Sequence, residues 1–290
     1  MNTQFQQLRT LLSSIYSEGE ARAIAFLVFE EAFGVSRTDI YADKVRQFSV
    51  DENERLSNMS QLLSKGVPVQ YVLGKCSFHG HVFNVSPAVL IPRPETEELV
   101  DWAIEKVCRQ GLQAPRILDA GTGSGCIAIS LKLALPQSEI TAWDISEDAL
   151  CVARENARLL HADVTFKEVD MLHPLKEKAT YDIIVSNPPY ICQSEEQEME
   201  RNVTEHEPHT ALFVPDSDPL RFYRALCSHA QRLLSPNGLL MVELNRAYGQ
   251  ATTRLFEESG LCSVELRQDA FGNDRMLLGK LPSVGNKSSL

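Results

Sequence analysis

Short apolar runs alternate with stretches of helical periodicity between residues 116 and 244, and no other feature of the sequence limits the fold as strongly. Alternation of this kind predicts a parallel β-sheet covered by helices on both faces. Two further runs, 263–266 and 275–279, are joined by a connection too short for a helix, so we expect them to pair antiparallel. The runs that we expect to form parallel strands are 117–120, 140–143, 164–169, 181–185 and 239–244.

The residues that precede this pattern have a different spacing of apolar positions. From residue 4 to about 65, apolar positions recur at helical spacing, which predicts a small helical domain. Short β-rich runs at 70–73 and 81–85 then indicate a hairpin, and helical spacing resumes over 95–107. We therefore predict a helical domain 1–75, a β-hairpin linker 76–92, an α/β domain 93–282 and a flexible tail 283–290.

Composition and charge exclude several classes of protein. The chain has 290 residues, of which 43% are hydrophobic and 23% charged, as in an ordinary globular protein rather than a disordered one. Its formal net charge of −11 argues against a protein that binds by neutralising nucleic-acid phosphates over a broad surface. The seven cysteines form no CxxC pair, so the sequence suggests neither a disulfide framework nor a zinc site.

The sequence also gives no reason to expect a membrane segment or a metal. The first residues lack a basic stretch followed by an apolar one, so we expect a cytoplasmic protein with reduced thiols and no membrane association. The pairs His79/His81 and His206/His209 have no further cysteine or carboxylate at ligand spacing, so no metal is expected. The acidic run 195–207 is typical of a solvated loop.

A glycine-rich turn joins the first predicted strand of the α/β domain to a helix, with the sequence Asp119-Ala120-Gly121-Thr122-Gly123-Ser124-Gly125. Glycines at such a turn let the backbone approach a ligand closely. The spacing Gly123-x-Gly125-x-x-Ala128 also satisfies the loose dinucleotide fingerprint, so a nicotinamide or flavin enzyme is an alternative. Asp119 favours S-adenosylmethionine, because a carboxylate here would repel a pyrophosphate and attract a cationic amino-acid group.

Two later acids follow predicted strands. Asp144 ends the second strand, where a carboxylate can accept hydrogen bonds from both hydroxyls of an adenosine ribose. Asp170 closes the third strand and is placed to receive an adenine amino group, with Met171 beside it. Each acid taken alone is as well explained by helix capping or solvation, because aspartate favours strand ends and helix N-termini.

The segment Ser186-Asn187-Pro188-Pro189-Tyr190 directly follows the fourth strand. Two prolines stiffen this loop and orient the Asn187 side-chain oxygen and the Pro188 carbonyl, and Tyr190 offers a flat face. Two fixed acceptors beside a flat ring suit a planar NH2 group. Hydrogen bonds to its N–H groups can aim the delocalised lone pair at an electrophile.

With these elements in place, the sequence resembles amino-group methyltransferases that use S-adenosylmethionine, and in particular the HemK/PrmC family of peptide chain release factor glutamine methyltransferases. The resemblance spans roughly residues 68–281 and extends to the helical domain in type only. The segments that carry it are Pro68-Val69-Gln70-Tyr71-Val72-Leu73-Gly74, Phe83-x-Val85, Leu90-Ile91-Pro92-Arg93-Pro94-Glu95-Thr96-Glu97, Glu207-Pro208-x-x-Ala211-Leu212 and Asp269-x-x-Gly272-x-x-Arg275.

The resemblance implies a Rossmann-like class I methyltransferase domain, with a mostly parallel seven-stranded sheet whose last strand is antiparallel. It implies that Gly121, Thr122, Gly123, Ser124 and Gly125 cradle S-adenosylmethionine, and that Asp144 binds its ribose. It also implies that Asn187, Pro188, Pro189 and Tyr190 hold the glutamine amide. Two positions depart from the family pattern: Met171 stands where many relatives carry an aromatic residue, and Asn245 where glycine is frequent.

The implied reaction is methyl transfer to N5 of the glutamine in the Gly-Gly-Gln loop of class I release factors, which the helical domain would recognise. Three alternatives remain at this point. The same Asn-Pro-Pro-Tyr chemistry serves DNA adenine-N6 and RNA guanine-N2 methyltransferases, although the acidic charge argues against stable nucleic-acid binding. A nicotinamide-dependent oxidoreductase and a non-catalytic binding module are the other two.

Overall fold

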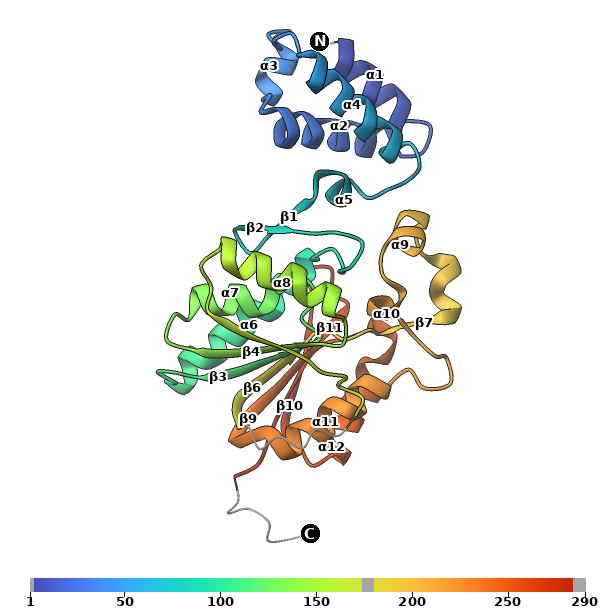
Figure 1. Cartoon of the computed structure of the whole chain (residues 1–290). Coiled ribbons are helices and arrows are strands. Elements are labelled where there is room, and N and C mark those ends of the chain that lie inside the picture. Colours follow the sequence, from blue (N-terminus) through green and yellow to red (C-terminus); the bar gives the residue numbers. More distant parts are fainter. Residues whose placement is uncertain (1–2, 174–179, 284–290) are drawn as a thin grey trace. The chain divides into compact units, whose positions relative to one another are not determined.

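The computed structural model describes residues 3–173 and 180–283, so residues 284–290 of the predicted tail lie outside the described part. The chain divides into two compact units (Figure 1). We call Met1–Lys75 together with Met199–His206 the helical unit. The remainder, Cys76–Glu198 and Glu207–Leu290, is the α/β unit. A short segment from the second half of the sequence therefore belongs to the helical unit, which no local pattern had indicated.

Side-chain caps explain where the helices of the helical unit begin. Ser17, Ser36 and Ser49 each accept a hydrogen bond from a backbone N–H of the following turn, and Ser49 forms a reciprocal capping box with Glu52. The apolar faces enclose a core rich in phenylalanine rings, among them Phe29. The helices are α1 (Thr3–Leu12), α2 (Glu18–Phe33), α3 (Arg37–Tyr41), α4 (Val50–Leu63), α5 (Val69–Leu73) and α9 (Arg201–His206).

The prediction of a strand at 70–73 is wrong, because this run forms helix α5. Pro68 precedes it, and the Pro68 carbonyl accepts hydrogen bonds from the backbone N–H groups of Tyr71 and Val72. Gly74 ends the helix in a left-handed conformation with φ of 71°. A four-residue apolar run fits either a strand or a helix, and the flanking proline and glycine decide in favour of the helix.

The predicted hairpin is present, but its first strand lies later in the chain. Strand β1 (Lys75–Phe78) pairs with β2 (His81–Asn84). Asn156, in helix α8 (Glu147–Leu159), ties the hairpin to the glycine-rich turn. Its Nδ2 donates to the carbonyls of Asn84 at 3.0 Å and Ser124 at 2.9 Å, and its Oδ1 accepts from the Asn84 N–H at 2.7 Å.

The central sheet has seven strands in the order β10-β11-β9-β6-β3-β4-β5. Every neighbouring pair is parallel except β10 with β11 and β11 with β9. The predicted fold class, with its antiparallel last strand, is confirmed. The strands are β3 (Arg116–Ala120), β4 (Glu139–Asp144), β5 (Val164–Glu168), β6 (Tyr181–Ser186), β9 (Leu234–Glu243), β10 (Cys262–Gln268) and β11 (Asp274–Lys280).

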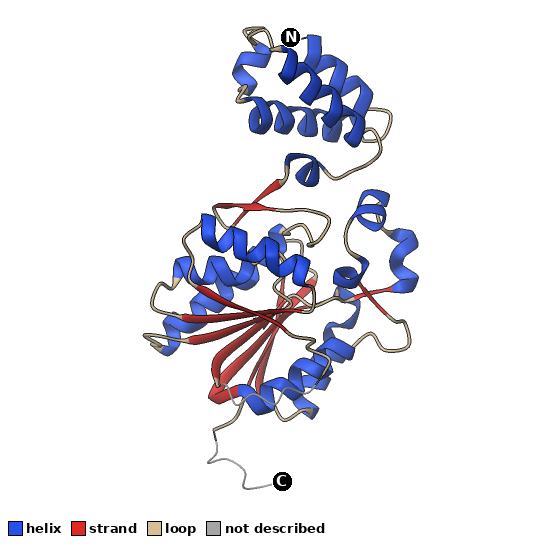
Figure 2. Ribbon diagram, in the orientation of Figure 1, coloured by secondary structure: helices blue, strands red, loops and turns tan. Residues whose placement is uncertain are grey.

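Helices cover both faces of this sheet (Figure 2). Alternate side chains of β3 and β6 enter different cores: Ile117 and Ile183 lie in one, and Leu118 and Ile184 in the other. This alternation is the two-residue period of a strand buried on both faces. The first core includes α6 (Pro94–Gln110), α7 (Cys126–Ala134) and the C-terminal part of α8; the second includes α11 (Arg221–Leu233) and α12 (Gly249–Glu258).

The connection between β6 and α11 leaves the sheet and returns to it. It contains a short parallel pair, β7 (Ile191–Cys192) with β8 (Phe213–Val214). Between them lie the 3-10 helix η1 (Gln193–Glu198), α9 and α10 (His209–Leu212). None of the helices in the described residues is long and apolar enough to cross a membrane.

Replacing Asn156 with alanine is expected to destabilise the α/β unit. The change leaves the backbone N–H of Asn84 and two carbonyls without their buried partner, so we expect a loss of about 3 kcal/mol in the free energy of unfolding. Both tryptophans, Trp102 and Trp143, belong to the α/β unit, so urea unfolding followed by tryptophan fluorescence measures this unit. Gln250→Ala, at an exposed position of α12 in the same unit, is the control, and an equal loss in both variants would contradict the bridging role.

Candidate active site

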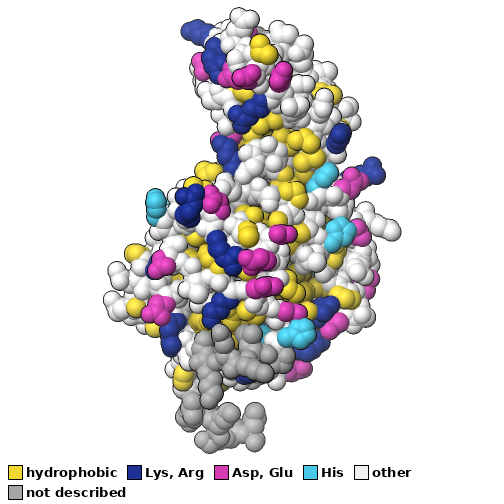
Figure 3. All heavy atoms as spheres, viewed as in Figure 1, with side chains coloured by type: hydrophobic (Ala, Val, Ile, Leu, Met, Phe, Trp, Pro, Cys, Tyr) yellow, Lys and Arg dark blue, Asp and Glu magenta, His cyan; other side chains and the backbone are white. Residues whose placement is uncertain are grey.

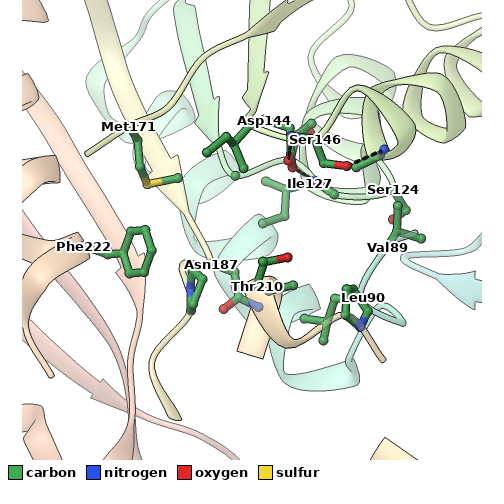
Figure 4. A pocket seen from close by; sticks show the side chains of 18 of the residues that line it. Val89, Leu90, Ser124, Ile127, Asp144, Ser146, Met171, Asn187, Thr210 and Phe222 are labelled. Carbon is green, nitrogen blue, oxygen red and sulfur yellow. Dashed lines mark hydrogen bonds between the residues drawn. The ribbon is translucent and has the colours of Figure 1, made fainter. Parts of the chain in front are cut away.

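A cavity of about 330 Å³ opens at the carboxyl ends of the parallel strands. In open α/β sheets ligands bind at this edge. Figure 4 shows Met171 and Phe222 on one side of the cavity and Val89 and Leu90 on the opposite side. The sequence-predicted residues that line it are Gly121, Thr122, Gly123, Ser124, Asp144, Asp170, Met171, Asn187 and Pro189. Four others, Asp119, Gly125, Pro188 and Tyr190, do not belong to this lining.

Gly123 and Gly125 serve the glycine-rich turn in different ways. Gly123 has φ of +54°, and a Cβ built on it would meet nothing within 4 Å, so this position faces open space at the cavity. Gly125 has φ of +82°, and its Cβ would lie 2.9 Å from Cδ1 of Ile129 and 3.2 Å from Cβ of Ala153. Gly125 therefore permits close packing of α7 on α8, whereas Gly123 leaves the backbone accessible to a ligand.

Asp119 lies fully buried beneath the turn. Its Oδ2 accepts hydrogen bonds from Oγ1 of Thr122 at 2.6 Å and from the N–H of Ala128 at 3.2 Å. Its Oδ1 has no hydrogen-bond partner within the described residues. Burial raises the pKa of Asp119 to about 7, because the ionised carboxylate has lost its hydration. A cationic ligand group bound nearby would favour the ionised form.

Asp144 connects the end of β4 to the glycine-rich turn. Its Oδ2 accepts from the N–H of Gly123 at 2.8 Å, and its Oδ1 accepts from the N–H of Ser146 at 2.9 Å. Burial raises the pKa of this carboxyl too. Asp170 is less enclosed: Oδ1 accepts from the N–H of Leu172 at 2.9 Å, and Oδ2 lies 2.7 Å from Nδ1 of His173.

The Asn187–Tyr190 loop is tied to α6 and β9 by a chain of buried polar side chains. Nδ2 of Asn187 donates to Oγ1 of Thr96 at 3.1 Å, and Oγ1 of Thr96 donates to Oε2 of Glu243 at 2.6 Å. The Tyr190 hydroxyl donates to Oε1 of Glu243 at 2.9 Å. Tyr190, which the sequence suggested as a flat face for the substrate, thus has its hydroxyl on Glu243 and does not line the cavity. It anchors the loop.

Two oxygens of this loop have their acceptor capacity free. No described residue donates a hydrogen bond to Oδ1 of Asn187 or to the carbonyl oxygen of Pro188. Asn187 lines the cavity, and the Pro188 carbonyl belongs to the same stiff loop. Oδ1 of Asn187 can therefore accept an N–H hydrogen bond from a planar group in the cavity, and the Pro188 carbonyl is a second free acceptor in the same loop.

The sequence reasoning missed four side chains that shape this site. Thr96 and Glu243 are described above. Arg93 lines the cavity and forms an ion pair with Glu207, whose side chain is only 1% exposed; the Nη2–Oε1 distance is 2.5 Å. The other oxygen of Glu207 accepts from the N–H of Ile91 at 3.1 Å. The prediction that 195–207 is a solvated loop is therefore wrong at Glu207, whose side chain is buried. Arg93, far away along the sequence, and the N–H of Ile91 compensate the cost of this burial.

Asn245, one of the two departures from the family pattern, also supports the loop. Its Nδ2 donates to the Tyr190 carbonyl at 3.2 Å and to the Glu195 carboxylate at 2.9 Å. Its Oδ1 accepts from the N–H of Ala247 and so caps the 3-10 helix η2 (Arg246–Tyr248). A glycine at this position would supply none of these side-chain contacts. The signals for Arg93, Thr96 and Glu207 were the family motifs 90–97 and 207–212, whereas Glu243 and Asn245 lie outside these motifs.

The two glycines are expected to respond differently to alanine. Gly125→Ala adds a steric clash to the unfavourable φ and should cost about 3 kcal/mol of unfolding free energy, whereas Gly123→Ala adds only the φ penalty of about 1–2 kcal/mol. Gly123→Ala should instead weaken binding of the expected cofactor, because its Cβ enters the ligand space. Urea unfolding and calorimetry with S-adenosylmethionine test both statements, and equal stability losses with unchanged affinity would refute this division.

Asp119 is expected to make the ligand-free protein less stable as pH rises. Its pKa is 3.8 in an ordinary setting and about 7 here, so the folded chain binds more protons than the unfolded chain between these values. The unfolding free energy of the wild type should fall from pH 4 to pH 7, relative to Asp119→Asn, and the difference should level off above pH 7. Urea unfolding of both proteins at several pH values measures this. A pH-independent difference would mean that Asp119 titrates normally.

Comparison with known protein families identifies two parts of the chain. A family model described as the PrmC N-terminal domain matches residues 4–74, and one described as the methyltransferase small domain matches residues 104–207. Two solved structures resemble the α/β fold: a methyltransferase from Pyrococcus furiosus has TM-score 0.50, 16% identity and coverage of 81% of this chain and 100% of its own. The T. thermophilus 16S rRNA N2 G1207 methyltransferase has TM-score 0.52, 18% identity and coverage of 71% and 49%. Because both structures are less than 25% identical to this chain, their similarity concerns the fold alone.

Curated relatives match nearly the whole chain. The release factor glutamine methyltransferase of Bacteroides thetaiotaomicron is 46% identical over 96% of this chain and 99% of its own. That of Flavobacterium psychrophilum is 41% identical over 95% and 96%. The resemblance seen in the sequence is thereby confirmed. The chain belongs to the release factor glutamine methyltransferase family, a family of S-adenosylmethionine-dependent enzymes with the class I methyltransferase fold.

Proposed function

We propose that this chain transfers a methyl group from S-adenosylmethionine to N5 of the glutamine in the Gly-Gly-Gln segment of class I peptide chain release factors. Membership of the family supports the reaction class. The observation that carries the proposal is Oδ1 of Asn187, a lining residue of the cavity whose oxygen accepts no hydrogen bond from the described residues; the Pro188 carbonyl follows it in the same stiff loop. In this proposal residues 1–75 recognise the substrate protein, and the hairpin segment 76–92 links them to the methyltransferase domain 93–282.

The residues present suit the cofactor. Bound S-adenosylmethionine supplies an electrophilic methyl group on a sulfonium. The turn offers accessible backbone at Gly123, and the buried Oδ1 of Asp119 has no hydrogen-bond partner among the described residues, as expected of a carboxylate beside a cationic ligand. Asp144 would hold the ribose hydroxyls, and Asp170 with Met171 would border the adenine. Met171 can cover an adenine face because its thioether side chain is soft and adaptable.

Asn187 and Pro188 would bind and aim the substrate amide. An amide nitrogen is a poor nucleophile because its lone pair is delocalised over the carbonyl. Two acceptors that take its N–H hydrogens orient that lone pair, and they gain strength as positive charge develops on nitrogen. The methylated nitrogen then loses a proton readily without a dedicated base, so this mechanism needs neither a nucleophilic side chain nor a covalent enzyme intermediate.

Charge distribution supports a protein substrate over a nucleic acid. The net charge is −11. On the face drawn in Figure 3, Lys and Arg side chains alternate with Asp and Glu side chains, and they do not gather into one broad basic surface. A protein that held nucleic acid mainly through phosphates would need such a surface.

Labelled S-adenosylmethionine, offered with a class I release factor, DNA and tRNA under matched conditions, tests the substrate. We expect label in the release factor, located by mass spectrometry on the glutamine of Gly-Gly-Gln. Preferential methylation of an adenine or guanine amine would overturn the substrate assignment. It would leave the cofactor and the role of Asn187 intact.

Asn187→Ala should abolish most of the methyl transfer without affecting the cofactor. Loss of one preorganised polar contact predicts a decrease in kcat of at least about 10²-fold, while calorimetry should give nearly unchanged S-adenosylmethionine affinity. Asn187→Asp should retain part of the activity, because an oxygen still faces the amide. Normal turnover in the alanine variant would show that the loop is only a turn.

A further inference from the structure

We infer that Thr96, fixed by Glu243, sets the orientation of the Asn187 carboxamide so that its oxygen rather than its nitrogen faces the substrate. Thr96 and Glu243 are thus positioning residues for the reaction. This inference rests on the proposed function, because it concerns how Asn187 receives the glutamine amide.

The carboxamide of asparagine has two ends of nearly equal size. Only the oxygen end can accept a hydrogen bond from a substrate N–H, whereas the NH2 end would oppose it with donors. Steric fit alone cannot select between the two orientations. A hydrogen-bonding neighbour of defined polarity can.

Thr96 has such a defined polarity because of Glu243. The threonine hydroxyl has a single proton, and Oε2 of Glu243 at 2.6 Å receives it. Oγ1 of Thr96 is then left as an acceptor toward Asn187, and Nδ2 of Asn187 donates to it at 3.1 Å. The reversed carboxamide would bring two lone-pair acceptors together, so the Asn187 oxygen is directed to the other side.

The carboxylate of Glu243 is itself constrained to act as an acceptor. It is 1% exposed, and its second oxygen accepts from the Tyr190 hydroxyl. The pKa of Glu243 is raised above its ordinary value, first by burial and also by the charge of Glu95, while the hydrogen bonds from Thr96 and Tyr190 and the charge of Arg275 oppose this rise. Arg275 is in turn held by Asp269, at 3.1 Å between Nε and Oδ2. The motif Asp269-x-x-Gly272-x-x-Arg275 thereby contributes to the charge balance at Glu243.

A double-mutant cycle between Thr96 and Asn187 tests this orientation directly. In the otherwise wild-type enzyme, Thr96→Val should lower kcat about tenfold, the value of one hydrogen bond, with the KM for release factor and the cofactor affinity within about twofold. Thr96→Ser should restore most of kcat, because it keeps the hydroxyl. In the Asn187→Asp background, Thr96→Val should leave kcat unchanged or raise it. Both ends of the aspartate carboxylate are oxygens, so no orientation has to be selected.

Thr252→Val is the matched control. Thr252 is fully buried in α12, and its hydroxyl donates to the Tyr248 carbonyl, so it reproduces the loss of a buried threonine hydroxyl away from the site. Its kcat should equal that of the wild type. An undiminished kcat in Thr96→Val, or the same decrease in the wild-type and the Asn187→Asp backgrounds, would overturn the inference.

A measurement on the unmodified enzyme covers the case in which Thr96→Val does not fold. The side-chain amide signals of Asn187, identified in NMR spectra by their loss in Asn187→Asp, should include one N–H proton protected from solvent exchange. Free exchange of both protons would overturn the inference. This readout needs no turnover, so it separates failure of the inference from failure of the proposed function, which is shown by a wild-type enzyme that methylates no glutamine.

Discussion

The buried carboxylate of Glu243 is the contact on which the arrangement of the site depends. It lies at the end of β9 and accepts hydrogen bonds from Thr96 in α6 and from Tyr190 after β6. A carboxylate removed from water is costly unless such partners compensate it, so the three elements are required to meet at this point. The rigidity of the Asn187–Tyr190 loop therefore comes from this contact as well as from its prolines.

The cavity combines two kinds of recognition at one edge of the sheet. Asp119 is fully buried under the glycine-rich turn and Asp144 is partly buried, and burial raises the pKa of both carboxyls in the ligand-free chain. At the Asn187 loop, the free acceptors are neutral oxygens. In the proposed function, charged groups would serve a cofactor with a cationic amino-acid end, and neutral dipoles would serve an amide that becomes charged only as it reacts.

The segment that follows Glu207 forms another side of this cavity. The Arg93–Glu207 ion pair ties the segment leading to α10 to the residues just before α6. Thr210 and Phe213 of this returning segment line the cavity together with Leu90. Pro208 of the motif 207–212 and Leu90 of the motif 90–97 line this same cavity, although more than 100 residues separate them in the sequence.

The sequence by itself determined the layered α/β architecture, the glycine-rich turn and the Asn-Pro-Pro-Tyr loop. These features follow from local periodicity and local backbone chemistry, which a linear pattern records. It did not determine that 70–73 is helical, because a short apolar run suits either structure until its packing is known. Nor did it place Tyr190 on Glu243 or bury Glu207. Thr96 and Glu243 are 147 residues apart, so only the tertiary structure could decide that one orients the other. The reason is physical: a polar side chain acquires a role through the partner that compensates its burial, and chain distance says nothing about that partner.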